Sequence, residues 1–147
     1  MGRRKVAEEN KQSLGRALIV EDNPLLALEL ESALLDGGAD EVSLCDSVAA
    51  AMVELERVKP DILILDVHLA DRDDGWALAE LVTQLSPRPP AIVFSTGSPE
   101  QIPEPIARLG IVLVKPYRTE DLIATLREHL HKPGLLARLR GALASPD

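Results

Sequence analysis

Acidic, hydroxyl and basic side chains stand at the ends of four apolar segments of this chain. In chain order they are Glu21-Asp22, Asp66, Ser95-Thr96 and Lys115-Pro116. If the fold brings the three carboxylates together, each raises the pKa of its neighbours unless a cation lies among them. Several hard oxygen ligands suit Mg²⁺, and an ammonium group and a hydroxyl beside them would bind further anionic oxygens, such as those of a phosphoryl group. The set therefore indicates attack of a carboxylate on phosphorus.

Five short apolar segments must position these side chains. Each has four to six residues, and most lack the alternation of a half-exposed strand. This pattern favours a parallel sheet that is covered on both faces. The expected strands are Ala17–Glu21, Glu41–Cys45, Asp61–Asp66, Ala91–Thr96 and Ile111–Val114.

Helical patterns separate these strands. Asn23-Pro24 suits the start of a helix and Gly37-Gly38 suits its end. Further helices are expected over 47–58, 74–86 and 119–130. Strand and helix thus alternate, which predicts an α/β fold: a doubly wound five-stranded parallel sheet of the flavodoxin-like (βα)5 type, with strand order 2-1-3-4-5. In that order strands one, three, four and five are neighbours, so the side chains at their carboxyl ends meet at one edge.

The helix between the fourth and fifth strands is expected to be short or distorted. Pro103 and Pro105 lie in this segment, and each would remove a helical donor or clash with the preceding turn.

Composition and charge disfavour several other classes of protein. The 147 residues include 46% hydrophobic and 27% charged side chains, a balance typical of a globular domain. No apolar run approaches the ~20 residues of a membrane span, and the N-terminus lacks the apolar core of a secretory signal. With a single cysteine, Cys45, these features favour a cytoplasmic protein that does not bind membranes. Residues 18–130 hold 8 basic and 21 acidic side chains, a net charge of −13, which disfavours direct binding of nucleic acid.

The ordered set of polar residues resembles the receiver domain of the bacterial two-component response-regulator family, over about residues 16–131. The family pattern is an acidic pair after strand one, a phosphorylated Asp after strand three, Thr or Ser after strand four, and Lys-Pro after strand five. The matching residues of this chain are Glu21-Asp22, Asp66, Thr96 and Lys115-Pro116.

The resemblance implies a role for each of these residues. Asp66 would accept a phosphoryl group from a histidine kinase or a histidine phosphotransferase. Mg²⁺ would be held by Asp22, Asp66 and the backbone carbonyl of His68, with Glu21 reaching it through water. Lys115 would contact the phosphoryl oxygens and Thr96 would move toward them. In this family the Lys-Pro peptide bond is usually cis.

Two positions complicate the comparison with the family. Thr96 lies thirty residues after Asp66, the usual separation, but counting from Pro90 favours Ser95, so we expect Thr96 and keep Ser95 as a candidate. Many receivers carry an aromatic residue three positions before the lysine, where this chain has Val112, and the nearby aromatic is Tyr117. We therefore hypothesise that activation orders or reshapes residues 97–108 instead of rotating a ring.

The segments outside the receiver-like region are interpreted as short appendages. Residues 1–15 are expected to form a polar N-terminal extension and residues 132–147 an amphipathic tail, too short for a DNA-binding or enzymatic domain. We expect a stand-alone receiver, monomeric or weakly dimeric, that is not an enzyme and signals by phosphorylation-dependent binding to a downstream protein. Alternatively, the tail begins a linker to an output domain.

Three other functions use similar residues. A phosphohydrolase of the haloacid-dehalogenase type would carry its nucleophile after the first strand in an Asp-x-Asp pair, where this chain has Glu21-Asp22. In a flavin-binding module the phosphate loop would follow the first strand, where these carboxylates would repel it. A pseudo-receiver that binds its partner regardless of phosphorylation would not need the complete acid-hydroxyl-lysine set.

Overall fold

A computed structural model describes residues 12–69 and 75–131 of the chain, and its strands form one parallel sheet. The five strands lie in the order β2-β1-β3-β4-β5. The expected fold class and strand order are therefore confirmed. The strands are β1 (Gly15–Val20), β2 (Ala39–Cys45), β3 (Ile62–Asp66), β4 (Ala91–Thr96) and β5 (Ile111–Val114).

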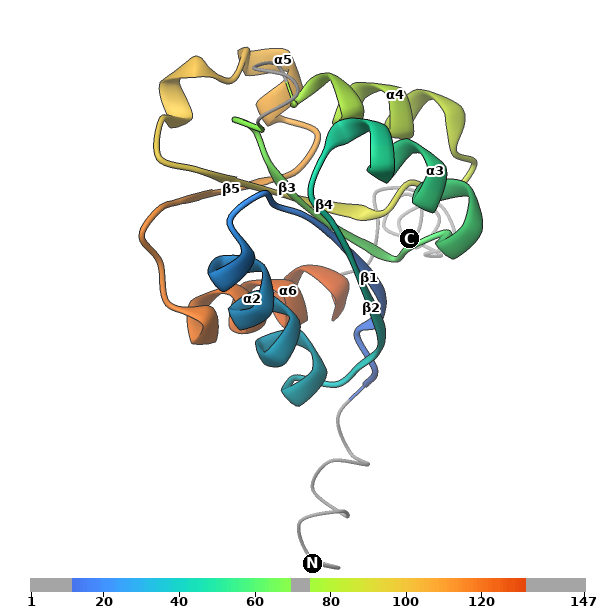
Figure 1. The fold of residues 1–147 in the computed structure, drawn as a ribbon, viewed down its shortest axis with the longest axis vertical. Helices are drawn as coiled ribbons and strands as arrows, with labels where there is room; N and C mark the ends of the chain where they lie inside the picture. The colour runs from blue at the N-terminus through green and yellow to red at the C-terminus, as the bar shows by residue number, and fades with distance from the viewer. Residues whose placement is uncertain (1–11, 70–74, 132–147) are drawn as a thin grey trace, which may run out of the picture.

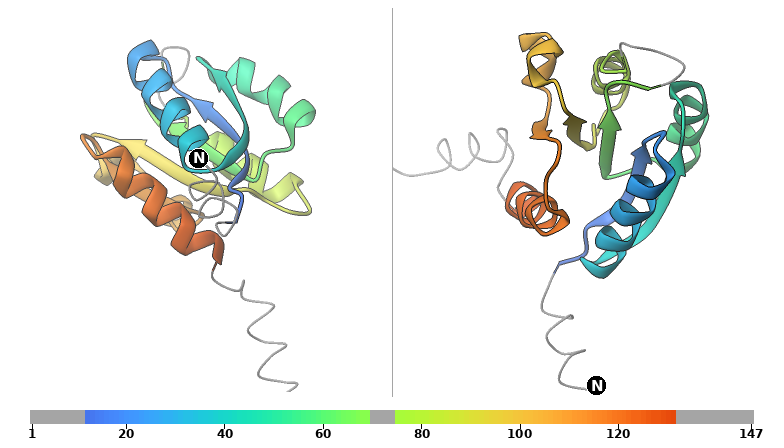
Figure 2. Two further views of the ribbon diagram at one scale, coloured as in Figure 1. Left: turned by 90° about the horizontal axis from the view of Figure 1, so that it is seen from below. Right: turned by 60° about the vertical axis from the view of Figure 1, so that its left-hand side comes forward.

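Helices cover both faces of this sheet, as Figures 1 and 2 show. On one face, α2 (Pro24–Asp36) packs beside α6 (Thr119–His131). The elements on the other face are α3 (Val48–Val58), α4 (Ala77–Leu85), the 3₁₀ turn η1 (Pro99–Gln101) and α5 (Glu104–Ala107). The central strands β1, β3 and β4 are therefore shielded from water on both faces, which is why they are continuously apolar.

The core consists of two apolar layers, one on each face of the sheet. Successive residues of a strand point to opposite faces, so in β1 Leu18 and Val20 join the layer under α3 and α4, while Ala17 and Ile19 join the layer under α2 and α6. The other central strands alternate in the same way. By this alternation Asp66 and Ser95, which pair across β3 and β4, lie on the α2–α6 side of the sheet.

Polar caps begin the two helices that follow β1 and β2. The side chain of Asn23 accepts hydrogen bonds from the N–H groups of Leu25 and Leu26, with Pro24 at the first helical position. The side chain of Ser47 accepts from the Ala50 N–H at the start of α3. Both helix starts were predicted, because the signal for each lies within a few adjacent residues.

Some boundaries differ from those predicted. β1 and β2 begin two residues earlier than expected, since Gly15 pairs with Ala39 and strand pairing depends on backbone partners as well as on apolar side chains. The helix expected over 74–86 begins at Ala77, and residue 74 lies outside the described residues. The segment between β4 and β5 is reduced to η1 and the four-residue α5, as its prolines predict.

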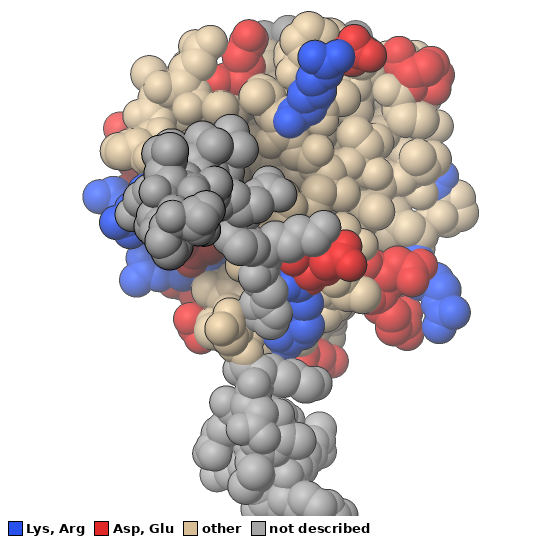
Figure 3. Space-filling model, turned by 180° about the vertical axis from the view of Figure 1, so that it is seen from behind, with Lys and Arg blue, Asp and Glu red and all other residues tan. Residues whose placement is uncertain are grey.

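Within residues 12–69 and 75–131, no helix has both the length and the hydrophobicity needed to cross a bilayer. On the face seen in Figure 3, most basic side chains stand beside acidic ones, and a broad area carries neither.

Gly110, which precedes β5, offers a test of how tightly this sheet is packed. A Cβ atom at Gly110 would overlap the backbone carbonyl oxygen of Ile92, whereas one at Gly97 would meet open space. We expect Gly110→Ala to lower the free energy of unfolding by about 2 kcal/mol, because the strands must separate to admit the methyl group. Gly97→Ala, the matched control, should change it by less than about 0.5 kcal/mol. Urea unfolding of both variants measures this, and equal stabilities would contradict the packing described.

Candidate functional site

Three carboxylates meet at the carboxyl ends of β1 and β3. Glu21, Asp22 and Asp66 each place a carboxylate oxygen within 4.8 Å of the others. Glu21 and Asp66 are only 3% and 5% exposed, whereas Asp22 is exposed to solvent. The structure thus brings together the acidic residues that the sequence analysis singled out.

Backbone donors hold the two buried carboxylates in place. The Asn23 N–H donates to Glu21 Oε2 over 3.1 Å, and the His68 N–H donates to Asp66 Oδ1 over 3.0 Å. Each donor lies two residues after its acceptor, so the loop after each strand folds back on the acid that ends it. The His68 side chain itself is exposed.

Lys115 supplies the positive charge opposite these acids. Its Nζ lies 3.3 Å from Glu21 Oε1 and 3.6 Å from Asp66 Oδ2. Its backbone N–H donates to the Thr96 carbonyl over 2.7 Å, which ties the end of β5 to the end of β4. The Lys115-Pro116 peptide bond is cis, as expected.

The two candidate hydroxyls at the end of β4 have different partners. Thr96 Oγ1 accepts from the Ser98 N–H over 2.9 Å and lies at the start of the loop toward η1. Ser95 is fully buried and its Oγ lies 2.8 Å from the Tyr117 hydroxyl. Both residues thus lie at the edge that carries the acids.

The Ser95–Tyr117 contact was not predicted from the sequence. A serine inside a buried strand needs a hydrogen-bond partner, so the sequence indicated that Ser95 would have one. No nearby residue indicated that the partner would be Tyr117. Val112, at the position where many receivers have an aromatic residue, is half-buried and packs against the α3–α4 layer.

Burial and neighbouring charge shift the titration of Glu21. Burial raises the pKa of Glu21 from 4.5 to about 7, and the Asp66 carboxylate adds to the rise, while the Asn23 N–H and the Lys115 ammonium oppose it. A cation among these oxygens would favour the ionised form. The oxygen donors, their spacing and this raised pKa suit a hard divalent ion such as Mg²⁺.

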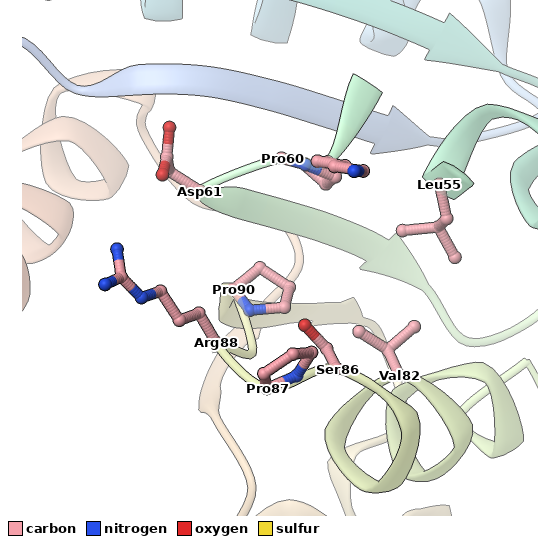
Figure 4. A pocket seen from close by; sticks show the side chains of 9 residues that line it. Leu55, Pro60, Asp61, Val82, Ser86, Pro87, Arg88 and Pro90 are labelled. Atoms are coloured by element: carbon pink, nitrogen blue, oxygen red, sulfur yellow. The ribbon is translucent and has the colours of Figure 1, made fainter. Parts of the chain in front are cut away.

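The acidic cluster borders one of several surface hollows. A hollow of about 540 Å³ is lined by Glu21, Asp22 and residues of α2, β2 and α3. The pocket in Figure 4, of about 440 Å³, lies at the other edge of the sheet, where Asp61 and Pro90 precede β3 and β4. The candidate site residues lie at the carboxyl edge, where doubly wound sheets usually bind ligands.

Comparison with known proteins identifies the family. The sequence profile described as "Response regulator receiver domain" matches residues 17–127. The chain belongs to this family, as the sequence analysis expected. Members are signalling domains that generally bind Mg²⁺ in an acidic pocket.

Individual relatives agree with this result. The sensory transduction protein LytT of Bacillus anthracis is 32% identical over 117 residues, which is 78% of this chain and 46% of LytT. The transcriptional regulatory protein PdtaR of Mycobacterium tuberculosis is 28% identical over 88% of this chain and 63% of PdtaR. The chain thus spans less than two thirds of these relatives. A receiver domain (CheY-like) from Methylobacillus flagellatus has the same fold, with a TM-score of 0.70 and 24% identity over 79% of this chain and 98% of that one.

The raised pKa of Glu21 predicts an unusual pH dependence of stability in the metal-free protein. Between about pH 4.5 and pH 7 the folded chain retains a proton that the unfolded chain has released. Stability therefore falls as the pH rises through this window, by about 3 kcal/mol for this one group. Urea unfolding with a chelator present should show that the free energy of unfolding falls with pH more steeply in wild type than in Glu21→Gln, whose side chain cannot ionise. Parallel curves for the two proteins would contradict the assignment, and Mg²⁺ should reduce the fall.

Proposed function

Because the chain is a receiver domain, we propose that Asp66 accepts a phosphoryl group from a histidine kinase or a histidine phosphotransferase. The observation that carries this proposal is the placement of Asp66. It ends β3, it is 5% exposed, and its Oδ2 lies 3.6 Å from the Lys115 ammonium. Burying an ionised carboxylate is costly unless a cation pairs with it or a function requires it. Lys115 would provide the cation and would still leave an oxygen of Asp66 able to react.

The proposed transfer is an in-line displacement at phosphorus. An oxygen of Asp66 forms the new P–O bond while the P–N bond to the donor histidine breaks. The histidine nitrogen leaves with the bonding electron pair and takes up a proton. The His68 N–H fixes the orientation of the Asp66 carboxylate, so little reorganisation is needed before attack.

Charge is the main obstacle to this reaction, because a carboxylate must approach a phosphoryl group. Lys115 would bind the phosphoryl oxygens and give up part of its contact with Glu21 and Asp66. Asp22, Asp66 and the His68 carbonyl would hold Mg²⁺, with Glu21 reaching it through water, and the ion would supply further positive charge at the developing transition state.

The signal would leave the site through the end of β4. Thr96 would turn its hydroxyl toward the phosphoryl oxygens, and its present bond to the Ser98 N–H would be exchanged. Residues 97–108, which hold η1 and the short α5, would then reorder and present a surface to a downstream protein. This segment holds only one 3₁₀ turn and a four-residue helix, and short elements of this kind open more readily than long helices.

The remaining expectations belong to the same proposal. We place the protein in the cytoplasm, as a monomer or weak homodimer that acts through protein contacts and not on nucleic acid. The receiver would span residues 16–131 between a polar extension and a short tail, both of which lie largely outside the described residues.

Labelling with a small phosphodonor tests Asp66 directly. With acetyl phosphate and Mg²⁺, wild type should form an acid-stable, base-labile adduct, and Asp66→Asn should form none. Lys115→Ala should label about 100-fold more slowly, because the phosphoryl charge is then less well stabilised. Asp36→Asn, an exposed carboxylate at the end of α2, is the matched control and should label like wild type.

Other outcomes would favour other functions. Turnover of many phosphomonoesters would favour a phosphohydrolase. A wild type that forms no adduct with any donor, yet binds a partner, would favour the phosphorylation-independent adaptor.

Amide hydrogen exchange tests the proposed output. Adding Mg²⁺ and beryllium fluoride, a mimic of the phosphoryl group, should change exchange within residues 97–108 by about tenfold or more, because a rearranged segment gains or loses hydrogen bonds. Asp66→Asn should show no such change. Equal exchange in both states of wild type would rule out this segment as the output.

A further inference from the structure

The hydroxyls of Ser95 and Tyr117 form a buried pair beside the acidic cluster. Their oxygens lie 2.8 Å apart. Ser95 is fully buried and pairs in the sheet with Asp66. Tyr117 comes two residues after Lys115 and packs against the core layer under α2 and α6. The pair therefore joins the strand beside the predicted phosphoacceptor to the loop that carries the predicted phosphoryl-binding lysine.

This pair is not needed to fill the core. An alanine and a phenylalanine would occupy almost the same space, and replacing both partners of a buried hydrogen bond by apolar groups of the same shape is often nearly neutral. Burial raises the pKa of the Tyr117 phenol above its usual value, so the hydroxyl keeps its proton and remains a hydrogen-bond donor or acceptor for Ser95.

The pair is accompanied by a second link between β4 and the loop after β5. This second link is the backbone bond from the Lys115 N–H to the Thr96 carbonyl. The two links lie on either side of the Lys115-Pro116 bond, one at Lys115 itself and one at Tyr117. Together they fix the direction in which the Lys115 side chain leaves the backbone, and its Nζ lies 3.3 Å from Glu21 and 3.6 Å from Asp66.

We propose that the Ser95–Tyr117 pair is a positioning element that holds the loop after β5 so that the Lys115 ammonium faces Asp66, and that it links this site to the start of α6 at Thr119. The inference rests on the proposed function of Asp66 and Lys115. In this chain the link to the site comes from an aromatic residue after the Lys-Pro pair, while the earlier position holds Val112 in the opposite core layer.

Three variants separate positioning from simple stabilisation. Tyr117→Phe and Ser95→Ala each remove one hydroxyl and leave its partner buried and unpaired, so both should be less stable to urea than wild type. The double variant should recover much of that stability, because neither hydroxyl then lacks a partner. Labelling by acetyl phosphate with Mg²⁺ should be about tenfold slower in all three, since a misplaced catalytic group is costly even when the fold is intact.

A spectroscopic measurement reports on the link itself. Tyr117 is the only tyrosine of the chain, so ¹³C-tyrosine labelling gives signals from this ring alone. Adding Mg²⁺ and beryllium fluoride should shift these signals in wild type. The shift should be largely lost in Ser95→Ala, in which the ring stays but its link to β4 is gone.

The outcomes are distinct. Labelling at the wild-type rate in the double variant, or rates that follow stability across the three variants, would overturn the positioning role while leaving the proposed function in place. An unlabelled wild type would overturn the proposed function, and this inference with it.

Discussion

Repulsion between like charges at the carboxyl edge of the sheet is the constraint on which the site depends. Glu21, Asp22 and Asp66 place oxygens within 4.8 Å of one another, and two of the three are buried. Such an arrangement persists only if other groups offset its cost. Lys115 provides the opposing charge and backbone N–H groups provide dipoles, yet the pKa of Glu21 is still raised to about 7. Burial is the largest cause of this rise and the Asp66 carboxylate adds to it, so a cation among these oxygens would favour the ionised form of Glu21.

The fold brings these residues together because they stand at the carboxyl ends of three strands: Glu21-Asp22 follows β1, Asp66 ends β3 and Lys115 follows β5. A parallel sheet with helices on both faces points all its carboxyl ends the same way, so residues separated by more than ninety positions, such as Glu21 and Lys115, become neighbours. The apolar strands do not take part in the chemistry. They set the register that brings Asp66 beside Ser95, while the last residues of the strands and the loops after them carry the polar side chains.

Most of the fold could be predicted from the sequence because its signals are local. Continuous apolar strands, the cap at Asn23 and the prolines of residues 97–108 each act within a few residues. The acidic cluster could be predicted because residues at the carboxyl ends of neighbouring parallel strands lie together at one edge of the sheet. The Ser95–Tyr117 pair could not, since it joins a residue of β4 to the loop after β5, and no local pattern reports which side chains meet across the core. The starts of β1 and β2 were wrong by two residues for a related reason: Gly15 and Ala39 extend each other's strand through backbone bonds, which side-chain patterns do not report.

Asn23 serves two structures at once. Its side chain caps α2 while its own N–H holds Glu21, so the first turn of a major helix and a buried acid of the cluster share one residue. Any ion that draws Glu21 toward itself must therefore act on the geometry at the beginning of α2. By mass action, whatever binds the folded site also stabilises the fold. Ion binding at Glu21 and formation of the first turn of α2 are coupled here through Asn23, which contacts both. The concentration of a divalent ion that binds this cluster would then set how firmly the start of α2 is anchored.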